Sequence, residues 1–263
     1  MIEVIKSVDG LARQKWDVLI PTMGALHAGH QSLIKLGKNL GSKVIVSIFI
    51  NPLQFENKSD LESYPKSFDQ DLQVAEQSGA TAIFAPAESD IYAGEIQKIE
   101  AGATGVIFEG KSRPGHFSGV LTVVKRLFDL VNPKHAIFGE KDFQQLFLIK
   151  KMVSDLKLPI NIVAAPTIRD SNNLALSSRN SRLSAAEKEI AKVIYQAINQ
   201  NNVDQAREIL KKADGFSLDY LEVIDEQSFN LATPETKNKR LIIAGWVNQV
   251  VFPFFSLPYS AWA

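Results

Sequence analysis

The sequence predicts an α/β fold, with a mainly parallel sheet in the first two thirds and a smaller α+β domain after it. In the first part, short apolar runs rich in β-branched residues alternate with amphipathic segments, as in βαβ units. After about residue 180 the alternation stops, and two helical stretches precede two strand-like runs. The 263 residues, 45% of them hydrophobic, suffice to bury one large and one small core.

Each expected element of the first part has its own signal. The buried strands are short apolar runs, at 18–22, 43–50, 81–86, 135–140 and 160–165. The helices between them are amphipathic, at 30–40, 68–77, 119–131 and 143–156. Ligands of such sheets bind beyond the carboxyl ends of the strands, so we expect functional residues directly after these runs.

The second part is expected to be a small α+β domain. A polar-faced helix covers 184–200, a further helical stretch reaches residue 213, and strand-like runs lie at 219–225 and 240–247. We place a hinge within 177–184, which gives domains of residues 1–178 and 179–263.

Composition narrows the partners and the location of the protein. The 29 basic and 29 acidic side chains cancel, so no electrostatic footprint for nucleic acid or a membrane surface is present. The absence of cysteine excludes disulfides and thiolate chemistry. No signal-peptide pattern and no membrane-spanning apolar run occurs. We expect a soluble cytoplasmic protein.

The segment from Met23 to His30 follows the first of these strands and begins a helix. Glycine lets the backbone approach a ligand, and the positive end of the helix dipole attracts phosphate. The imidazoles of His27 and His30, three residues apart, can both donate to developing charge. A zinc pair or two surface histidines is the alternative, but no third ligand motif accompanies them. We therefore interpret the segment as a phosphate site.

Two further strand ends carry polar side chains with two interpretations each. Asn51 and Gln54 suit the oxygens of a small polar substrate, or they are a capping and a solvated residue. After residue 139, Lys141 suits a phosphate, Asp142 a helix cap, a metal or a ribose, and Gln145 a pocket wall. A capped helix with solvated charges also explains that segment.

Two loops have open interpretations as well. The hydroxyls of Ser177 and Ser178 beside the guanidinium of Arg179 form either a phosphate clamp or an ordinary linker. The basic loop at 110–117 is either a lid over an anionic ligand or a solvated turn.

Five segments, taken in order, resemble the pantothenate synthetase (pantoate–β-alanine ligase) family. They are PTMGALHAGH, INPLQF, KSRPGHFSGVLTVVKRLFDLVNP, AIFGEKDFQQL and PTIRDSNNLALSSRNSRLS, within residues 18 to about 183. The His-x-Gly-His pattern alone would indicate only the wider nucleotidyltransferase superfamily. The resemblance implies a Rossmann-like ATP-binding domain, a C-terminal lid domain, a homodimer and Mg²⁺-dependent chemistry.

The resemblance also implies roles for individual residues. His30 would be catalytic, assisted by His27 and Lys141, while Gln54 and Gln145 would bind pantoate, with Gln54 also near β-alanine. The metal ligands are not identified. The implied ATP-binding residues are Met23, Gly24, Ala25, Leu26, His27, Ala28, Gly29, His30, Gly139, Glu140, Lys141, Asp142, Ile168, Leu176, Ser177, Ser178 and Arg179.

Some positions depart from the family pattern. Leu121 stands where the family usually has alanine, which would narrow the wall beside pantoate, and Ser118 stands where a basic residue is common. The apolar segment 250–263 matches no family motif.

The implied reaction forms pantoyl adenylate from pantoate and ATP, and β-alanine then displaces AMP to give pantothenate. One alternative is a nucleotidyltransferase that joins ATP to a phosphorylated cofactor precursor, which would have no need of paired amides. Another is a non-catalytic nucleotide-binding module. The products distinguish the three.

Overall fold

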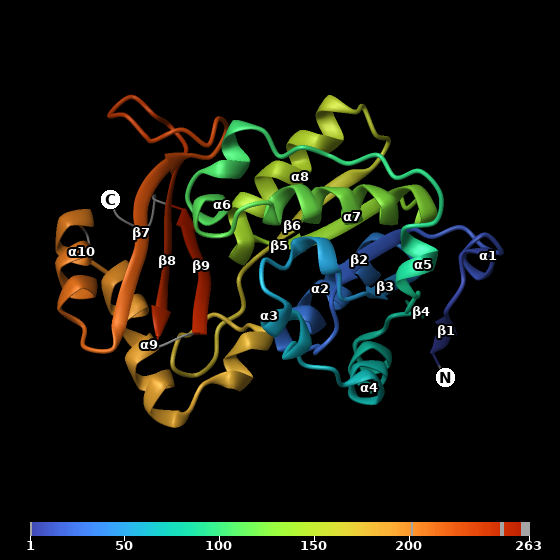
Figure 1. The fold of residues 1–263 in the computed structure, drawn as a ribbon, viewed down its shortest axis with the longest axis horizontal. Coiled ribbons are helices and arrows are strands. Elements are labelled where there is room, and N and C mark those ends of the chain that lie inside the picture. The colour runs from blue at the N-terminus through green and yellow to red at the C-terminus, as the bar shows by residue number, and fades with distance from the viewer. Residues whose placement is uncertain (1, 201, 248–249, 259–263) are drawn as a thin grey trace. The chain divides into compact units, whose positions relative to one another are not determined.

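The computed structural model describes residues 2–200, 202–247 and 250–258 (Figure 1). Backbone contacts divide the chain into two compact units. The N-terminal unit comprises Met1–Gly139 and Leu148–Pro166, and the C-terminal unit comprises Glu140–Phe147 and Thr167–Ala263. This division by contacts differs from the domain boundary that we predict after residue 178, and that boundary remains a prediction.

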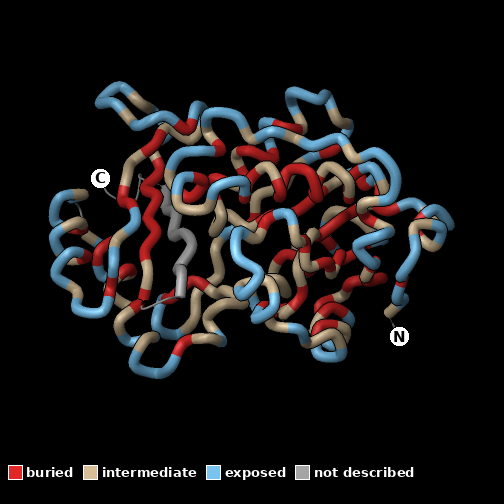
Figure 2. The backbone as a smooth tube through the Cα atoms, viewed as in Figure 1, coloured by how far each residue is buried: buried red, intermediate tan, exposed pale blue. Residues whose placement is uncertain are grey.

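The N-terminal unit is built on a six-stranded parallel sheet with the strand order β1-β4-β3-β2-β5-β6. The strands are β1 (Glu3–Ile5), β2 (Val18–Thr22), β3 (Val44–Ile48), β4 (Ala82–Phe84), β5 (His135–Gly139) and β6 (Asn161–Ala165). The central residues of β2, β3, β4 and β5 are buried, as Figure 2 shows, because helices cover both faces of the sheet. The predicted parallel α/β fold is confirmed.

Helices pack on both faces of this sheet because the chain winds outward in two directions from β2. The first direction runs from β2 to β3 and β4, and places α2 (Ala28–Leu40) and α4 (Phe68–Ser78) on one face. The second returns past β2 to β5 and β6, and so places α7 (His116–Val131) on the other face (Figure 1). The helix after β5 is α8 (Phe143–Asp155).

The remaining helices of the first 166 residues are short. They are α1 (Val8–Leu11), α3 (Lys58–Glu62), α5 (Glu88–Ile91), α6 (Glu109–Ser112), and the 3₁₀ helices η1 (Pro52–Gln54), η2 (Ala103–Val106) and η3 (Glu140–Asp142).

The chain changes direction in the sheet between β2 and β5. β2 pairs with β3 from Val18 to Thr22, whereas its pairing with β5 comprises Val18–His135 and Leu19–Ala136. Such a switch point is where doubly wound sheets bind ligands. The loop that begins at Met23 leaves the sheet there.

The C-terminal unit has the predicted α+β architecture. An antiparallel sheet of β7 (Phe216–Asp225), β8 (Lys239–Val247) and β9 (Val250–Pro258) accompanies η4 (Ser178–Arg182), α9 (Ala185–Ile198) and α10 (Val203–Lys212). Apolar residues of both helices and of β7 and β8 form one buried cluster. The Ser184 side chain and Glu187 form a capping box that begins α9, and Asn202 caps α10.

Two strands were not predicted. β1 is only three residues long and lies at the sheet edge, so its apolar pattern is too short to recognise. β9 contains Pro253 in an apolar run, and proline argues against a strand unless the strand lies at an edge, which is the position of β9. Among the described residues, no helix is long and apolar enough to cross a membrane.

Candidate active site

The loop after β2 is held in a tight, partly left-handed conformation. Gly24 has φ of 82° and Ala25 has φ of 51°. The Gly24 amide donates to the Thr22 hydroxyl at 3.1 Å, and that hydroxyl donates to the carbonyl of Ser47 at 2.6 Å. A Cβ at residue 24 would lie 2.9 Å from a carboxylate oxygen of Asp71, so only glycine fits.

Asp71 anchors this loop from α4, and the sequence pattern did not single it out. Its side chain is 1% exposed and accepts the Ala25 amide at 2.9 Å on Oδ2 and the Leu26 amide at 2.7 Å on Oδ1. A carboxylate that accepts from two backbone amides fixes both. From sequence alone, an aspartate on the polar face of a helix is expected to be solvated, so no local signal could have predicted that Asp71 anchors the loop.

The two histidines cap the helix that they begin. The Nδ1 atom of His27, the N-cap of α2, accepts from the Gly29 amide at 3.1 Å. The Nδ1 atom of His30 accepts from the His27 amide at 3.3 Å, and the two ring centroids lie 4.2 Å apart. A ring nitrogen that accepts carries no proton, so each neutral ring carries its proton on Nε2. The predicted pair therefore comes together as two neighbouring Nε2–H groups.

Backbone amides of the loop are already used by protein acceptors. Those of Gly24, Ala25, Leu26, His27 and Gly29 all donate within the unit. The first turn of α2 is thus capped within the protein. Its positive dipole end remains, and the imidazole side chains supply the donors for an anion there.

The predicted amides after β3 have different roles from each other. Asn51 is 1% exposed, caps η1 by accepting the Leu53 amide, and also bonds Tyr92, Gly119 and Gln54. Of the two interpretations, substrate binding or capping, the structure therefore shows Asn51 in the capping role. Gln54 is buried and not solvated, and its Nε2 atom lies 3.1 Å from the sulfur of Met23. Gln54 and the loop after β2 therefore meet.

A buried charged cluster holds the backbone of Gln54. The Nδ1 atom of His116 lies 2.8 Å from the Gln54 carbonyl, which can only accept, so Nδ1 donates. Arg113 lies 3.0 Å from the Nε2 atom of His116 and 2.8 Å from Oε1 of Glu109, which is 3% exposed. In segment 110–117, α6 ends at Ser112 and α7 begins at His116. The turn between them contains the exposed Pro114 and Gly115, as the solvated-turn interpretation expects, whereas His116 is buried.

The two positions that depart from the family pattern lie on α7. Leu121 is 3% exposed and packs in the core. The Ser118 hydroxyl accepts the Ala101 amide at 3.2 Å and donates to Glu100 at 3.3 Å, so it fastens the segment that precedes η2.

The charged segment after β5 belongs to the C-terminal unit and is anchored there by Arg240. The Lys141 ammonium lies 2.5 Å from Oδ1 of Asp142, and both side chains are partly exposed. Glu140 lies 3.6 Å from Arg240, whose guanidinium stacks 4.0 Å above the ring of Phe143. Gln145 is half-buried in the first turn of α8.

The predicted hinge region at 177–184 contains η4, and a hairpin at 168–176 precedes it. The Leu176 amide donates to the Ile168 carbonyl at 2.9 Å, which brings these two predicted ATP-binding residues together. Asp170 holds the turn by accepting the amides of Asn172 and Leu174. The Ser177 hydroxyl caps η4 by accepting the Arg179 amide at 3.3 Å.

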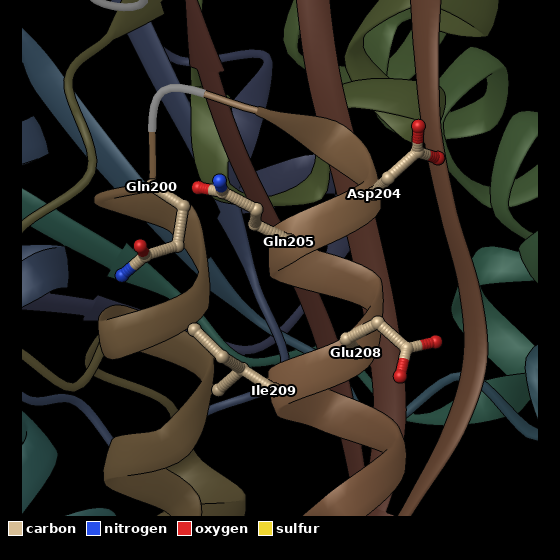
Figure 3. A pocket seen from close by; sticks show the side chains of 5 residues that line it. All are labelled: Gln200, Asp204, Gln205, Glu208 and Ile209. Atoms are coloured by element: carbon tan, nitrogen blue, oxygen red, sulfur yellow. The ribbon is translucent and has the colours of Figure 1, made fainter.

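A hollow of the C-terminal unit lies apart from all predicted site residues. It lies against α9 and α10, where Gln205 and Ile209 point toward Gln200 while the carboxylates of Asp204 and Glu208 point away (Figure 3). Within the described part of the chain, no group of three histidine or acidic side chains is placed to hold a metal ion.

A doubly wound sheet with a histidine pair and buried amides beside its switch point defines an enzyme of the nucleotide-binding α/β class. The family model described as pantoate-beta-alanine ligase matches residues 2–252. The chain therefore belongs to the pantoate–β-alanine ligase family, and the activity of that family is the ATP-dependent condensation of pantoate with β-alanine.

Individual relatives agree with this family. The chain is 44% identical over 224 residues to a pantothenate synthetase of Acidothermus cellulolyticus, covering 80% of this chain and 74% of the relative. It is 42% identical to that of Akkermansia muciniphila, covering 85% and 84%.

Two solved structures share the fold. A pantothenate synthetase of Thermus thermophilus superposes with a TM-score of 0.88 at 34% identity, covering 98% of both chains. A pantoate–β-alanine ligase of Francisella tularensis superposes with a TM-score of 0.87 at 35% identity, covering 99% of this chain and 98% of that one. The latter was solved with a β,γ-ATP compound and β-alanine.

Proposed function

We propose that this chain makes pantothenate, AMP and diphosphate in two half-reactions through an enzyme-bound pantoyl adenylate. In the first, a pantoate carboxylate oxygen attacks the α-phosphorus of ATP and the bond to the β-phosphate breaks, which releases diphosphate. In the second, the β-alanine amine attacks the acyl carbon, the bond to AMP breaks, and the amine loses a proton. The family match and the histidine pair at the switch point support this proposal.

The first half-reaction needs alignment and charge stabilisation, because a carboxylate is already ionised at neutral pH. We assign stabilisation of the phosphate oxygens to the Nε2–H groups of His30 and His27 and to the ammonium of Lys141. Nδ1 caps orient both rings before ATP arrives, so little reorganisation accompanies the reaction. Ser178 and Arg179 supply further donors, and Gly139–Asp142, Ile168 and Leu176–Arg179 complete the nucleotide site.

We assign pantoate to the side-chain amides of Gln54 and Gln145, with β-alanine near Gln54. The burial of Gln54 and its contact with Met23 support this assignment, since its amide lies against the loop that we assign to ATP. A buried amide can bond the hydroxyl and carboxylate oxygens of pantoate, which the ribose-binding surface of a nucleotidyltransferase would not require.

Magnesium enters as part of the MgATP substrate. Mg²⁺ retains waters and binds substrate phosphates with one or two carboxylates, so it needs no cage of protein ligands. The described residues fit this mode, since Asp142 offers a partly exposed carboxylate beside Lys141. Bound there, the ion would neutralise charge on the phosphates.

The C-terminal unit, in this proposal, closes as a lid during the reaction. An acyl adenylate hydrolyses unless water is excluded, which gives a closing domain a purpose. We assign the lid role to the predicted domain of residues 179–263. If this domain acts as a lid, the adenylate should survive on the enzyme until β-alanine arrives.

We further propose that the chain acts as a homodimer in the cytoplasm, on small molecules only and without nucleic acid or membrane partners. The family resemblance supports the dimer. The use of ATP, which is abundant in the cytoplasm, supports that compartment. Light scattering behind size exclusion gives the mass in solution directly. A mass of one chain at micromolar concentration contradicts the dimer.

The test of the function is to measure diphosphate and AMP release from MgATP, with pantoate alone and then with β-alanine. Diphosphate release with pantoate, and continued AMP release only after β-alanine is added, are expected. Binding of ATP without diphosphate release points to a non-catalytic module, and a dinucleotide product points to a nucleotidyltransferase.

A further inference from the structure

The side chain of Asn51 makes four hydrogen bonds inside the N-terminal unit. Its Oδ1 atom accepts the Leu53 amide at 3.2 Å and the Tyr92 hydroxyl at 2.6 Å. Its Nδ2 atom donates to the Gly119 carbonyl at 3.1 Å and to Oε1 of Gln54 at 3.1 Å. An amide side chain has two donors and two acceptor sites, so all of them are engaged.

Backbone groups determine which end of the Asn51 amide is oxygen. A backbone N–H can only donate and a carbonyl can only accept, so the oxygen faces Leu53 and the nitrogen faces Gly119. The Tyr92 hydroxyl at the same oxygen must therefore donate. Reversing the amide would set donor against donor and acceptor against acceptor in a buried site.

The orientation of Asn51 passes on to Gln54. The atom of Gln54 that meets Nδ2 of Asn51 must be an acceptor, which is Oε1. Nε2 then lies on the other side, 3.1 Å from the sulfur of Met23. A thioether is a weak acceptor, so a substrate oxygen can replace it at low cost.

We propose that Asn51 and Tyr92 are positioning residues that fix the Gln54 amide with its N–H groups, and not its carbonyl, toward the substrate. This inference rests on the proposed function, in which Gln54 binds pantoate. The ligand group that fits is an acceptor, a carboxylate or hydroxyl oxygen of an acid. Asn51 does not touch the substrate in this arrangement.

A fixed amide selects its ligand, whereas a freely rotating one accepts either polarity. A donor group such as an ammonium or an amide N–H placed at Gln54 would face N–H groups and leave both unpaired. Burial raises the pKa of the Tyr92 phenol, so its hydroxyl keeps the proton that it donates at neutral pH.

The test is a double-mutant cycle of Tyr92→Phe and Gln54→Ala, read as the KM for pantoate in diphosphate release. Tyr92→Phe should raise this KM roughly threefold to tenfold, as loss of one neutral hydrogen bond does. In the Gln54→Ala background the same change should add less than about twofold, because Tyr92 acts through Gln54. The KM for ATP should not follow this pattern.

Tyr64→Phe is the matched control, since Tyr64 is a second buried tyrosine of the same unit. It should leave the KM for pantoate unchanged in both backgrounds. An equal rise of the KM with Tyr92→Phe in both backgrounds would overturn the inference, since Tyr92 would then act independently of Gln54.

A second measurement reads the polarity of Gln54 directly. In ¹⁵N-labelled protein, the side-chain amide signals that disappear in Gln54→Ala belong to Gln54. Added pantoate should move these proton signals downfield, and Tyr92→Phe should weaken that shift. Signals that stay in place while pantoate turns over overturn the inference alone, whereas a wild-type chain that neither binds nor turns over pantoate overturns the proposed function with it.

Discussion

The imidazole rings of His27 and His30 have two tasks that use different ring atoms. Nδ1 accepts a backbone amide of the first turn of α2, and Nε2 carries the proton that the proposed chemistry requires. At the residue scale, stability and activity can therefore be separated, because one nitrogen serves each.

His30→Asn and His30→Gln separate the two tasks. The short asparagine side chain can still accept the His27 amide but has no group at the position of Nε2. We expect its kcat to fall roughly 10²–10³-fold, as for loss of one preorganised donor. Its melting temperature should stay near that of the wild type. His30→Gln should lose about 1 kcal/mol of unfolding free energy with the cap, and keep more activity than His30→Asn. The reverse order of the two activities would contradict this division.

Asp71→Asn tests the anchor of the loop after β2. The NH₂ group of the asparagine would face one of the two backbone N–H groups that now donate to Asp71, so one of these hydrogen bonds would be lost. We expect the unfolding free energy to fall by about 1–3 kcal/mol. The KM for ATP should also rise, because Ala25 and Leu26 lose their fixed position. Denaturant unfolding and steady-state kinetics measure the two effects. Asp69→Asn, the same change at an exposed site of α4, is the control and should alter neither.

At the scale of elements, the contact of η1 with α7 positions Gln54. α7 approaches η1 so closely that a Cβ at Gly119 would lie 2.2 Å from the Leu53 carbonyl oxygen and 2.9 Å from the backbone nitrogen of Gln54. The adjacent turn of α7 contributes His116, which bonds the Gln54 carbonyl. Helix packing thus determines where the amide lies.

Gly119→Ala should move η1 away from α7. Backbone atoms cannot turn aside as a flexible side chain can, so overpacking should cost about 1–3 kcal/mol of unfolding free energy. The KM for pantoate should rise with it, while the KM for ATP should change little. An equal rise in both Michaelis constants would indicate general loosening of the N-terminal unit.

At the scale of the whole molecule, the two ends of the parallel sheet have different tasks. The proposed catalytic groups follow the carboxyl ends of the strands, whereas Asp17 ties segments together at the amino ends. Its carboxylate accepts from the amides of Ser42 and Lys43 at 3.1 Å and from Lys134 at 2.8 Å. The bond from Lys134, followed by that from Lys43, lowers the pKa of Asp17 to about 2.

Because the folded-state pKa of Asp17 lies below its unfolded value, this carboxylate stabilises the fold above about pH 4 and ceases to do so as pH falls toward 2. Lys134 is largely exposed, so screening reduces the contribution to about 1 kcal/mol. Asp17→Asn should lose that amount at pH 7, and its difference from the wild type should shrink as the pH falls below 4. Denaturant unfolding at both pH values measures this, and activity at pH 7 should not change.

Much of the architecture could be predicted from local patterns. The strand at Val18–Thr22 matches its predicted range, because a buried strand is a continuous apolar run wherever it lies in the sheet. Two helices begin earlier than predicted, at Ala28 and His116, because histidine side chains and glycines do not mark a helix start clearly, whereas α4 and α8 begin at the predicted residues. The roles of His30, Lys141, Gln54 and Gln145 stay predictions.

Local patterns in the chain sufficed to predict the α/β class, the family and the segments that form the candidate site, because each rests on residues close together in the chain. Only the tertiary structure revealed the anchoring by Asp71, the orientation of Gln54 through Asn51 and Tyr92, and the cluster that contains Glu109. These contacts join segments distant in sequence. The donor or acceptor role of an amide or imidazole follows from its partners, and packing of the sheet and helices places those partners.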